Sequence, residues 1–175
     1  MHCLVRYGVI PEVARCQLTG DSDLARGQEV VIESHRGLQL GTVVEALRPG
    51  TRRLTDMATE TVEQEPESAF SVIRAASAED QHRSRELRIA AEDEFTAWQR
   101  RIAQWQVDVQ LVDLEWTLDR AKLILYVLNE RGPECTKLAI QAAAAGLGVV
   151  EVQPVSSEGI VSQPNAGCGS CGCHN

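Results

Sequence analysis

The sequence is short of aromatic side chains and of positive charge. Phe, Trp and Tyr make up 4% of its 175 residues, so a core must rest on aliphatic side chains, for which the 43% hydrophobic residues suffice. The formal net charge is −8 and the pI about 5.0. This argues against a protein that coats nucleic acid through its overall field, because phosphate affinity comes from clustered Lys and Arg. It leaves room only for a local basic patch.

Long apolar segments are also lacking. No apolar run approaches the roughly 20 residues that a membrane-spanning helix needs. The N-terminal stretch MHCLVRYGVI has no long apolar region of the kind found in a signal peptide. We therefore expect a soluble, cytoplasmic protein. Thiols stay reduced in that compartment, so closely spaced cysteines indicate metal or redox chemistry rather than disulfides.

The first part of the chain has the pattern of a small β-domain. Four runs are rich in β-favouring residues: 2–10, 12–20, 30–32 and 38–47. Arg36-Gly37 forms a hairpin turn between the last two, and Gly41 marks either a bulge or a point of close backbone approach. So many short strands predict a small barrel or curled sheet. Residues 48–68 are expected to be a connection, and we place a domain boundary at about residue 70.

A long amphipathic helix follows. Ser77 can cap its first backbone amides, and Asp80 can reach back as in a capping box. One apolar stripe then recurs at spacings of three and four residues: Leu87, Ala91, Phe95, Trp98, Ile102 and Trp105. We predict that both tryptophans are core residues rather than base-stacking platforms.

The remaining segments complete a mixed domain. They predict a half-buried strand, a turn, a central strand, an alanine-rich helix and a last strand: 112–118, 119–121, 123–128, 135–145 and 149–152. The expected fold is therefore α+β. A small N-terminal β-barrel-like domain over 1–70 precedes an α-β-β-α-β sandwich over 71–155 with both helices on one face, and a flexible cysteine-rich tail over 156–175.

Three blocks stand in order along the chain: GQEVVIESHRGLQLGTVV, ASAED and LVDLEWTLDRAKLILYVL. They resemble the patterns G-D-x-V-I-V-E-T-x-R-G-x-E-x-G-x-V, A-T-x-E-D and L-V-D-x-E-Y-T-F-D-x-x-K-x-x-F-Y-F of the RicT/YaaT family, the polymerase-suppressor C-terminal domain family. Order and spacing agree over roughly residues 4–130. The family then continues with an Arg-rich helix and strand and a C-G-x-x-x-C-C motif. Here most of those arginines are missing, and the cysteines return only at the chain end.

The resemblance implies a regulatory or scaffold protein rather than a catalyst. Family members are associated with a complex that assists an endoribonuclease in processing mRNA and carries iron–sulfur clusters on cysteines. We take six residues of the matched blocks as structural motif residues: Glu33, Gly37, Gly41, Asp113, Glu115 and Asp119.

The last eleven residues, NAGCGSCGCHN, form a candidate metal site. They hold four potential ligands: Cys168, Cys171, Cys173 and His174. Cys-x-x-Cys lets two sulfurs reach one metal, which suits zinc or an iron–sulfur cluster. Adjacent residues seldom ligate one ion, so a fourth ligand is expected from a partner or from one of three other cysteines: Cys3, Cys16 or Cys135. The alternatives are adventitious metal binding or a disulfide. Taken singly, those three cysteines are expected to be small buried hydrophobes.

The candidates for contact with a partner or with RNA are basic: Arg36, Arg48, Arg52 and Arg53, followed by Arg83, Arg85 and Arg88 on the helix. Arg36 can instead pair with Glu33 across the hairpin. Asp113 and Glu115 are residue types that serve acid–base catalysis or bind Mg²⁺. They alternate, however, as on any solvated strand face, and no P-loop, G-x-S-x-G or H-E-x-x-H motif accompanies them.

We therefore expect a non-catalytic adaptor that joins the protein subunits of a regulatory complex, with an endoribonuclease as a candidate partner. The alternative is an RNA-binding module that acts without a cluster. An unrecognised enzyme is the weakest reading, because no catalytic constellation is visible. The acidic pI favours the adaptor.

Overall fold

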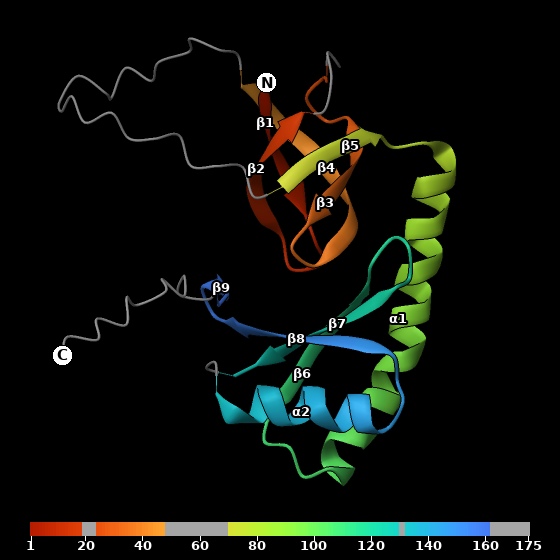
Figure 1. Ribbon diagram of the computed structural model, residues 1–175, viewed down its shortest axis with the longest axis vertical. Helices are drawn as coiled ribbons and strands as arrows, with labels where there is room; N and C mark the ends of the chain where they lie inside the picture. Colours follow the sequence, from red (N-terminus) through yellow and green to blue (C-terminus); the bar gives the residue numbers. More distant parts are fainter. Residues whose placement is uncertain (19–23, 48–69, 130–131, 162–175) are drawn as a thin grey trace, which may run out of the picture.

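The computed structural model describes residues 1–18, 24–47, 70–129 and 132–161. They form two stacked parts, a β-barrel and a sheet covered by helices (Figure 1). The predicted α+β class with an N-terminal barrel is confirmed. The predicted connection at 48–68 and the last fourteen residues, 162–175, lie outside the described residues.

The barrel is built from short strands: β1 (His2–Tyr7), β2 (Glu12–Leu18), β3 (Glu29–Ser34), β4 (Gly37–Leu47) and β5 (Phe70–Ala75). They close in the order β1-β2-β5-β3-β4, with β2 and β5 parallel and the other neighbours antiparallel. Alternate residues of β1 point inward, as the two-residue period of a strand requires: Cys3, Val5 and Tyr7. Because β5 belongs to the barrel, this part extends to Ala75, past the expected boundary at residue 70.

Gly41 allows β1 and β4 to approach closely. It pairs with Tyr7 of β1, and a Cβ atom added to it would lie 2.5 Å from Cγ1 of Val5 and 3.2 Å from the carbonyl oxygen of Arg6. The register shift between the two strands lies elsewhere, at Leu4/Val5. Of the two predicted roles for Gly41, close backbone approach is therefore the one that the structure supports.

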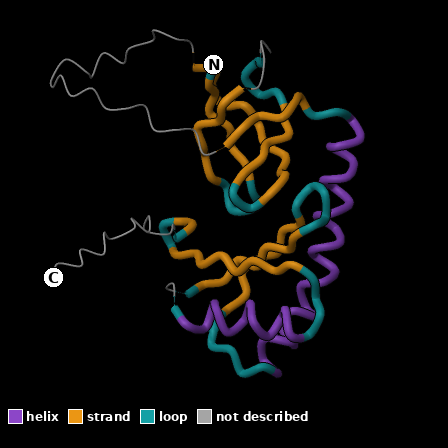
Figure 2. The backbone as a smooth tube through the Cα atoms, viewed as in Figure 1, coloured by secondary structure: helices purple, strands orange, loops and turns teal. Residues whose placement is uncertain are grey.

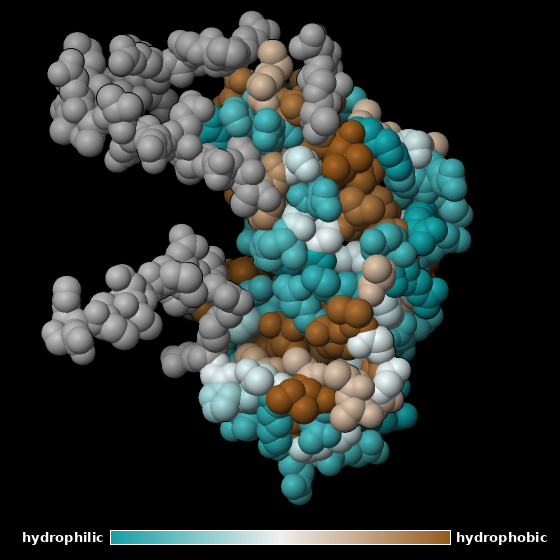
Figure 3. Space-filling view, viewed as in Figure 1, coloured by the Kyte–Doolittle hydropathy of each residue, from teal (hydrophilic) through white to brown (hydrophobic). Residues whose placement is uncertain are grey.

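Helix α1 (Ala78–Gln104) begins and packs as the sequence predicts. Ser77 and Asp80 form the capping box, with the Asp80 N–H donating to Oγ of Ser77 at 3.2 Å. Of the predicted stripe, four residues are buried and two partly buried: Leu87, Ala91, Trp98 and Ile102, then Phe95 and Trp105. The outer side of this helix, along the right of Figure 3, is largely hydrophilic.

The cap of α1 should make stability depend on pH. The Arg74 guanidinium, followed by the backbone N–H and the hydroxyl of Ser77, holds the pKa of Asp80 well below its usual range. A depressed folded pKa means that the stabilisation is complete above the unfolded value of about 4 and is lost as pH falls through the lower folded value. Asp80→Asn should therefore cost about 1–2 kcal/mol at neutral pH. The difference from wild type should shrink at about pH 3.

Urea unfolding at the two pH values measures this difference. Glu79→Gln, at an exposed neighbour in the same turn, is the matched control. A cost of Asp80→Asn that does not change with pH would mean that the carboxylate charge has no part in the cap.

The second part is a sheet in the order β6-β7-β8-β9 with α2. Its elements are β6 (Gln110–Trp116), β7 (Lys122–Leu128), α2 (Pro133–Ala144), β8 (Val149–Ser156) and β9 (Gly159–Ile160). Both described helices pack on one face against Leu123, Leu125 and Val127. The other face of β7 presents Ile124 and Tyr126. Lys122–Leu128 is therefore the predicted central strand, apolar on both faces.

Two details of the sheet differ from prediction. A register shift between Leu111 and Asp113 interrupts the expected alternation of β6, so Leu111 and Leu114 both pack in the helix-side core while Val112 is 40% exposed. The chain also stays ordered beyond residue 156, because β9 pairs with the end of β8. The expected tail from residue 156 thus begins with a turn and a short strand. Neither described helix has the length and apolarity needed to cross a bilayer.

Candidate functional site

The barrel is docked onto the free face of the sheet. Val9 and Ile10, in the β1–β2 turn, pack against Ile124 and Tyr126. In the turn between β6 and β7, the N–H of Leu118 donates to the carbonyl oxygen of Leu38 in β4 at 2.7 Å. Figure 2 shows the loops at the lower end of the barrel facing the sheet, with α1 running beside both.

A buried polar network, here named the Arg36 cluster, lies in this contact: Glu12, Ser34, Arg36, Gln39, Glu115 and Tyr126. The Arg36 guanidinium forms an ion pair with Glu12 and donates to the hydroxyl of Tyr126 at 3.2 Å. Its carbon lies 5.7 Å from the ring centroid of Tyr7 and 5.9 Å from that of Tyr126. Its side chain is 1% exposed. A charge buried to this degree is tolerated only when it is paired and hydrogen-bonded.

Glu115 is the acceptor at the centre of the cluster. It accepts from the Val9 N–H at 3.2 Å, from Nε2 of Gln39 at 2.9 Å and from the Tyr126 hydroxyl. One carboxylate therefore joins the β1–β2 turn, β4 and two strands of the sheet. Burial, followed by the Glu115 charge, raises the pKa of Tyr126 far above its usual range, so the phenol stays a proton donor at neutral pH.

The β3–β4 hairpin orients the arginine. The Ser34 hydroxyl donates to Oε1 of Gln39 at 2.6 Å and accepts the Arg36 N–H at 3.1 Å. Gly37, in the predicted hairpin turn, has φ +121°, and a Cβ added there would lie 3.2 Å from Cγ2 of Thr117. The hairpin turn and the turn after β6 therefore meet at a glycine.

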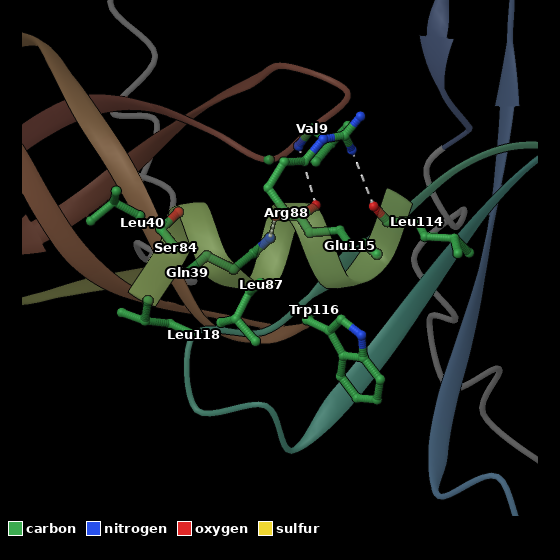
Figure 4. Close-up of a pocket in the computed structure, with 12 residues that line it drawn as sticks. Val9, Gln39, Leu40, Ser84, Leu87, Arg88, Leu114, Glu115, Trp116 and Leu118 are labelled. Carbon is green, nitrogen blue, oxygen red and sulfur yellow. Dashed lines mark hydrogen bonds between the residues drawn. The ribbon is translucent and has the colours of Figure 1, made fainter. Parts of the chain in front are cut away.

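A cleft of about 230 Å³ opens beside the cluster. Figure 4 shows side chains from the barrel, α1 and β6 around it, with the hydrogen bond from Val9 to Glu115 on one side. Its apolar lining includes Leu87 and Trp116, and Gln39 and Glu115 supply polar groups. Gln39 and Glu115 already bond to each other within the Arg36 cluster. We therefore interpret the cleft as a gap at the contact between the two parts of the chain rather than as a ligand site.

One family model matches the part of the chain that supplies Glu115 and Tyr126 to the contact between barrel and sheet. Residues 70–132 match the family model described as the PSP1 C-terminal conserved region. It is the domain family that RicT/YaaT proteins belong to, so the resemblance seen in the sequence is confirmed for this stretch. We refer to residues 70–132, the stretch that this model matches, as the PSP1 region. No curated protein and no solved structure matched the chain.

The PSP1 region contributes β5, α1 and the β6–β7 hairpin, and with them Glu115 and Tyr126. Glu12, Ser34, Arg36 and Gln39 precede it in the barrel. The Arg36 cluster is thus assembled from both sides of the boundary of the PSP1 region. Sequence reasoning missed four members of the cluster: Glu12, Ser34, Gln39 and Tyr126. The sequence does indicate Tyr126, because this residue stands at the second tyrosine of the pattern that the third block resembles. Glu12 lies in none of the three blocks.

The structure gives the predicted motif residues distinct contacts. Arg36 pairs with Glu12 rather than with Glu33, which is exposed. Asp113 pairs with Arg88 at 2.8 Å and accepts the Leu114 N–H at 2.7 Å. Arg88 also donates to the Leu114 carbonyl oxygen at 3.4 Å. The pair therefore bonds the N–H and the C=O of Leu114 in β6, the edge strand of the described sheet. Asp113 and Glu115 therefore serve different contacts.

Asp119 holds the turn between β6 and β7. Its carboxylate accepts the Thr117 hydroxyl at 2.6 Å and the Ala121 N–H at 3.0 Å. Burial acts to raise its pKa, but these hydrogen bonds outweigh burial and leave the pKa lowered. The neighbouring Arg120 takes φ +58°, so the turn is fixed by side-chain bonds rather than by a glycine.

The predicted contact residues are only partly described. Arg48, Arg52 and Arg53 lie outside the described residues. Arg36 was expected to contact a partner or RNA, yet its guanidinium is enclosed by the chain itself. On α1, Arg83 donates to the carbonyl oxygen of Leu118, and Arg88 pairs with Glu92 and Asp113. Arg83 and Arg88 therefore each bond to other groups of the chain itself.

The predicted metal ligands, Cys168, Cys171, Cys173 and His174, also lie outside the described residues. Cys3 and Cys16 are 0% exposed, and Cys135 is 8% exposed. They are packed in the two cores, as small hydrophobes would be. In this arrangement none of them can supply a fourth ligand to the tail without opening a core. The described residues contain no group of three or more His, Cys, Asp or Glu that could hold a metal ion.

Proposed function

We propose that the chain is a non-catalytic adaptor subunit of a cytoplasmic regulatory complex that assists an endoribonuclease in mRNA processing. The observation that carries the proposal is the PSP1 region at residues 70–132, because RicT/YaaT proteins belong to that domain family. The resemblance of the first block, which lies before this region, extends the likeness into the barrel.

The chemistry of the contact supports an adaptor over an enzyme. The two carboxylates that the sequence offered for acid–base work are held in internal bonds, Glu115 by three donors and Asp113 by Arg88. A general base needs a free lone pair directed at substrate. The Arg36 cluster instead joins the barrel to the sheet, which suits a protein that presents two surfaces in fixed relation.

Deleting the gene in the native host tests this function. We expect transcripts that the endoribonuclease processes to keep their unprocessed ends, as mapped by sequencing of RNA 5′ ends, and wild-type chain to restore processing. The tagged chain should co-purify with protein partners. Unchanged transcript ends in the deletion strain, or RNA cleavage by the pure chain that Glu115→Gln abolishes, would overturn the proposal.

The alternative, an RNA-binding module without a cluster, predicts a different result. Pure chain would then bind RNA, with an affinity that falls steeply with salt and weakens when Arg48, Arg52 and Arg53 are changed to alanine. The acidic pI and the internal engagement of Arg83 and Arg88 favour the adaptor. We expect weak RNA binding that these three changes leave nearly unaltered.

We also propose that the Cys168, Cys171, Cys173 and His174 set binds an iron–sulfur cluster or zinc, with the remaining ligands supplied by a partner chain. The burial of Cys3, Cys16 and Cys135 supports a partner as the source. Changing Cys168, Cys171 and Cys173 to serine should remove the metal and sulfide bound by the anaerobically purified complex. Elemental and sulfide analysis measures the metal and sulfide content, with Cys135→Ser as the matched control. Equal metal content in wild type and triple variant would refute the site.

A further inference from the structure

Cys3 and Cys16 face each other in the core of the barrel. They are direct partners in the antiparallel register of β1 and β2. Both are 0% exposed, and both belong to the cluster of buried side chains that fills the barrel. Each alone is a small buried hydrophobe, but the register makes them a pair of thiols on one side of one hairpin.

The register also sets their separation. The Leu18 N–H donates to the Met1 carbonyl oxygen at 2.9 Å, so Met1 and Leu18 are a hydrogen-bonded pair. Pair types alternate along an antiparallel ladder, and Cys3–Cys16, two steps along, is therefore of the same type. Cα atoms of such pairs lie about 5.5 Å apart, within the range of roughly 4.4–6.8 Å that disulfides span. Their Cβ atoms, at about 5.5 Å, are farther apart than the roughly 3.5–4.5 Å of a relaxed disulfide, so closing the bond requires a local shift of the two strands.

The folded barrel protects these thiols. The Sγ of Cys16 is directed at the carbonyl oxygen of Ala14 in the same strand, 3.8 Å away. Burial raises the pKa of both thiols, that of Cys16 to about 12. The thiolate is the reactive form in disulfide exchange, so the closed barrel suppresses the reaction. Strand β1 pairs with both β2 and β4, and the thiols become accessible only when it leaves the barrel.

We propose that Cys3 and Cys16 are a redox modification site, a dithiol that a small-molecule disulfide converts to an internal Cys3–Cys16 disulfide while β1 is out of the barrel. One thiolate attacks the small disulfide, giving a mixed disulfide and one released thiol. The second protein thiolate attacks the mixed disulfide and releases the second small thiol, which carries the other proton. The protein loses two electrons and the small disulfide gains them. Closure of the barrel then shields the product.

Oxidised glutathione tests the proposal on the full chain, with Cys168, Cys171 and Cys173 changed to serine so that they cannot compete. Samples are exposed in native buffer, at the urea midpoint, and during refolding from urea. Free thiols are then alkylated, and linked peptides are identified by mass spectrometry. Cys16→Ala in the same background is the matched control, and Cys135 serves as an internal buried thiol.

Several results are expected. The Cys3–Cys16 link should form at least about tenfold faster at the urea midpoint than in native buffer, because reaction follows the open state. Linked protein should refold as a monomer with a higher urea midpoint than the reduced protein, since the cross-link constrains the unfolded chain. In the Cys16→Ala variant, Cys3 should carry a glutathione adduct instead of the Cys3–Cys16 link.

Three results would overturn the proposal. Persistent glutathione adducts at both cysteines, with no link at the urea midpoint, would show that the pair does not close. Linked protein that fails to refold would show that the bond does not fit the barrel. Equal linking rates in native buffer and at the midpoint would show that burial does not control the reaction.

Discussion

Replacing Arg36 with alanine is expected to destabilise the chain by about 3–5 kcal/mol, the range for removing one partner of a buried ion pair. The change leaves Glu12 without its cation and the Tyr126 hydroxyl without the donor that Arg36 supplies. Glu12 keeps 26% side-chain exposure and can turn to water, which favours the lower end of the range. Urea unfolding at neutral pH, followed by circular dichroism, measures the loss.

Controls separate charge from packing. Arg85→Ala removes an exposed arginine from α1 and should change stability by less than about 0.5 kcal/mol. Arg36→Met keeps an apolar stem, and adding Glu12→Gln and Glu115→Gln removes the charges that it leaves behind. This triple variant should recover part of the loss, since neutralising a buried network removes its uncompensated charges. A loss no larger than that of Arg85→Ala would mean that the Arg36 cluster does not hold the two parts together.

The elements that the sequence predicts well depend on neighbouring residues. The start of α1 follows from Ser77 and Asp80, three positions apart, and its buried face follows from a stripe at helical spacing. The central position of β7 follows from apolar residues on both of its faces. In each case the residues that determine the structure lie in the same helix or strand as the feature that they predict.

The Arg36 cluster cannot be found this way. Arg36 bonds Tyr126 ninety positions away, and Val9 bonds Glu115 across 106 positions. Glu12 lies in a short strand with no motif around it. A local pattern offers Arg36 the nearby Glu33, as across any hairpin, and only the docking of the barrel onto the sheet brings Glu12 and Tyr126 to it instead.

The register shift of β6 is a further case. Strict alternation would place Val112 and Leu114 on one face, but packing against the helices selects Leu111 and Leu114. The extra residue is absorbed at Val112, and Asp113 then meets Arg88 of α1. The competing preference of a neighbouring helix overrides the two-residue period, and nothing within the strand indicates it.

Trp98→Ala is expected to cost about 3–5 kcal/mol, the range for deleting a large aromatic side chain from a core. Trp98 is 2% exposed and belongs to the core between the helices and the sheet. Its ring meets that of Trp105 edge-on with centroids 6.3 Å apart, and the Arg101 guanidinium lies 5.2 Å from its centroid. Deleting it opens a cavity that packed neighbours fill only partly.

Chemical denaturation with circular dichroism as the readout measures the loss without relying on tryptophan emission. Ile89→Ala, on the same helix at 59% exposure, is the matched control and should change stability by less than about 0.5 kcal/mol. If the barrel and the sheet unfold together, as their shared buried cluster requires, Trp98→Ala should move a single transition to lower urea. A separate, unshifted barrel transition would show that the contact built around Arg36 and Glu115 does not couple the two parts. A loss of stability no larger than that of Ile89→Ala would mean that Trp98 is not a core residue. Stacking of Trp98 on RNA bases would then become the alternative role.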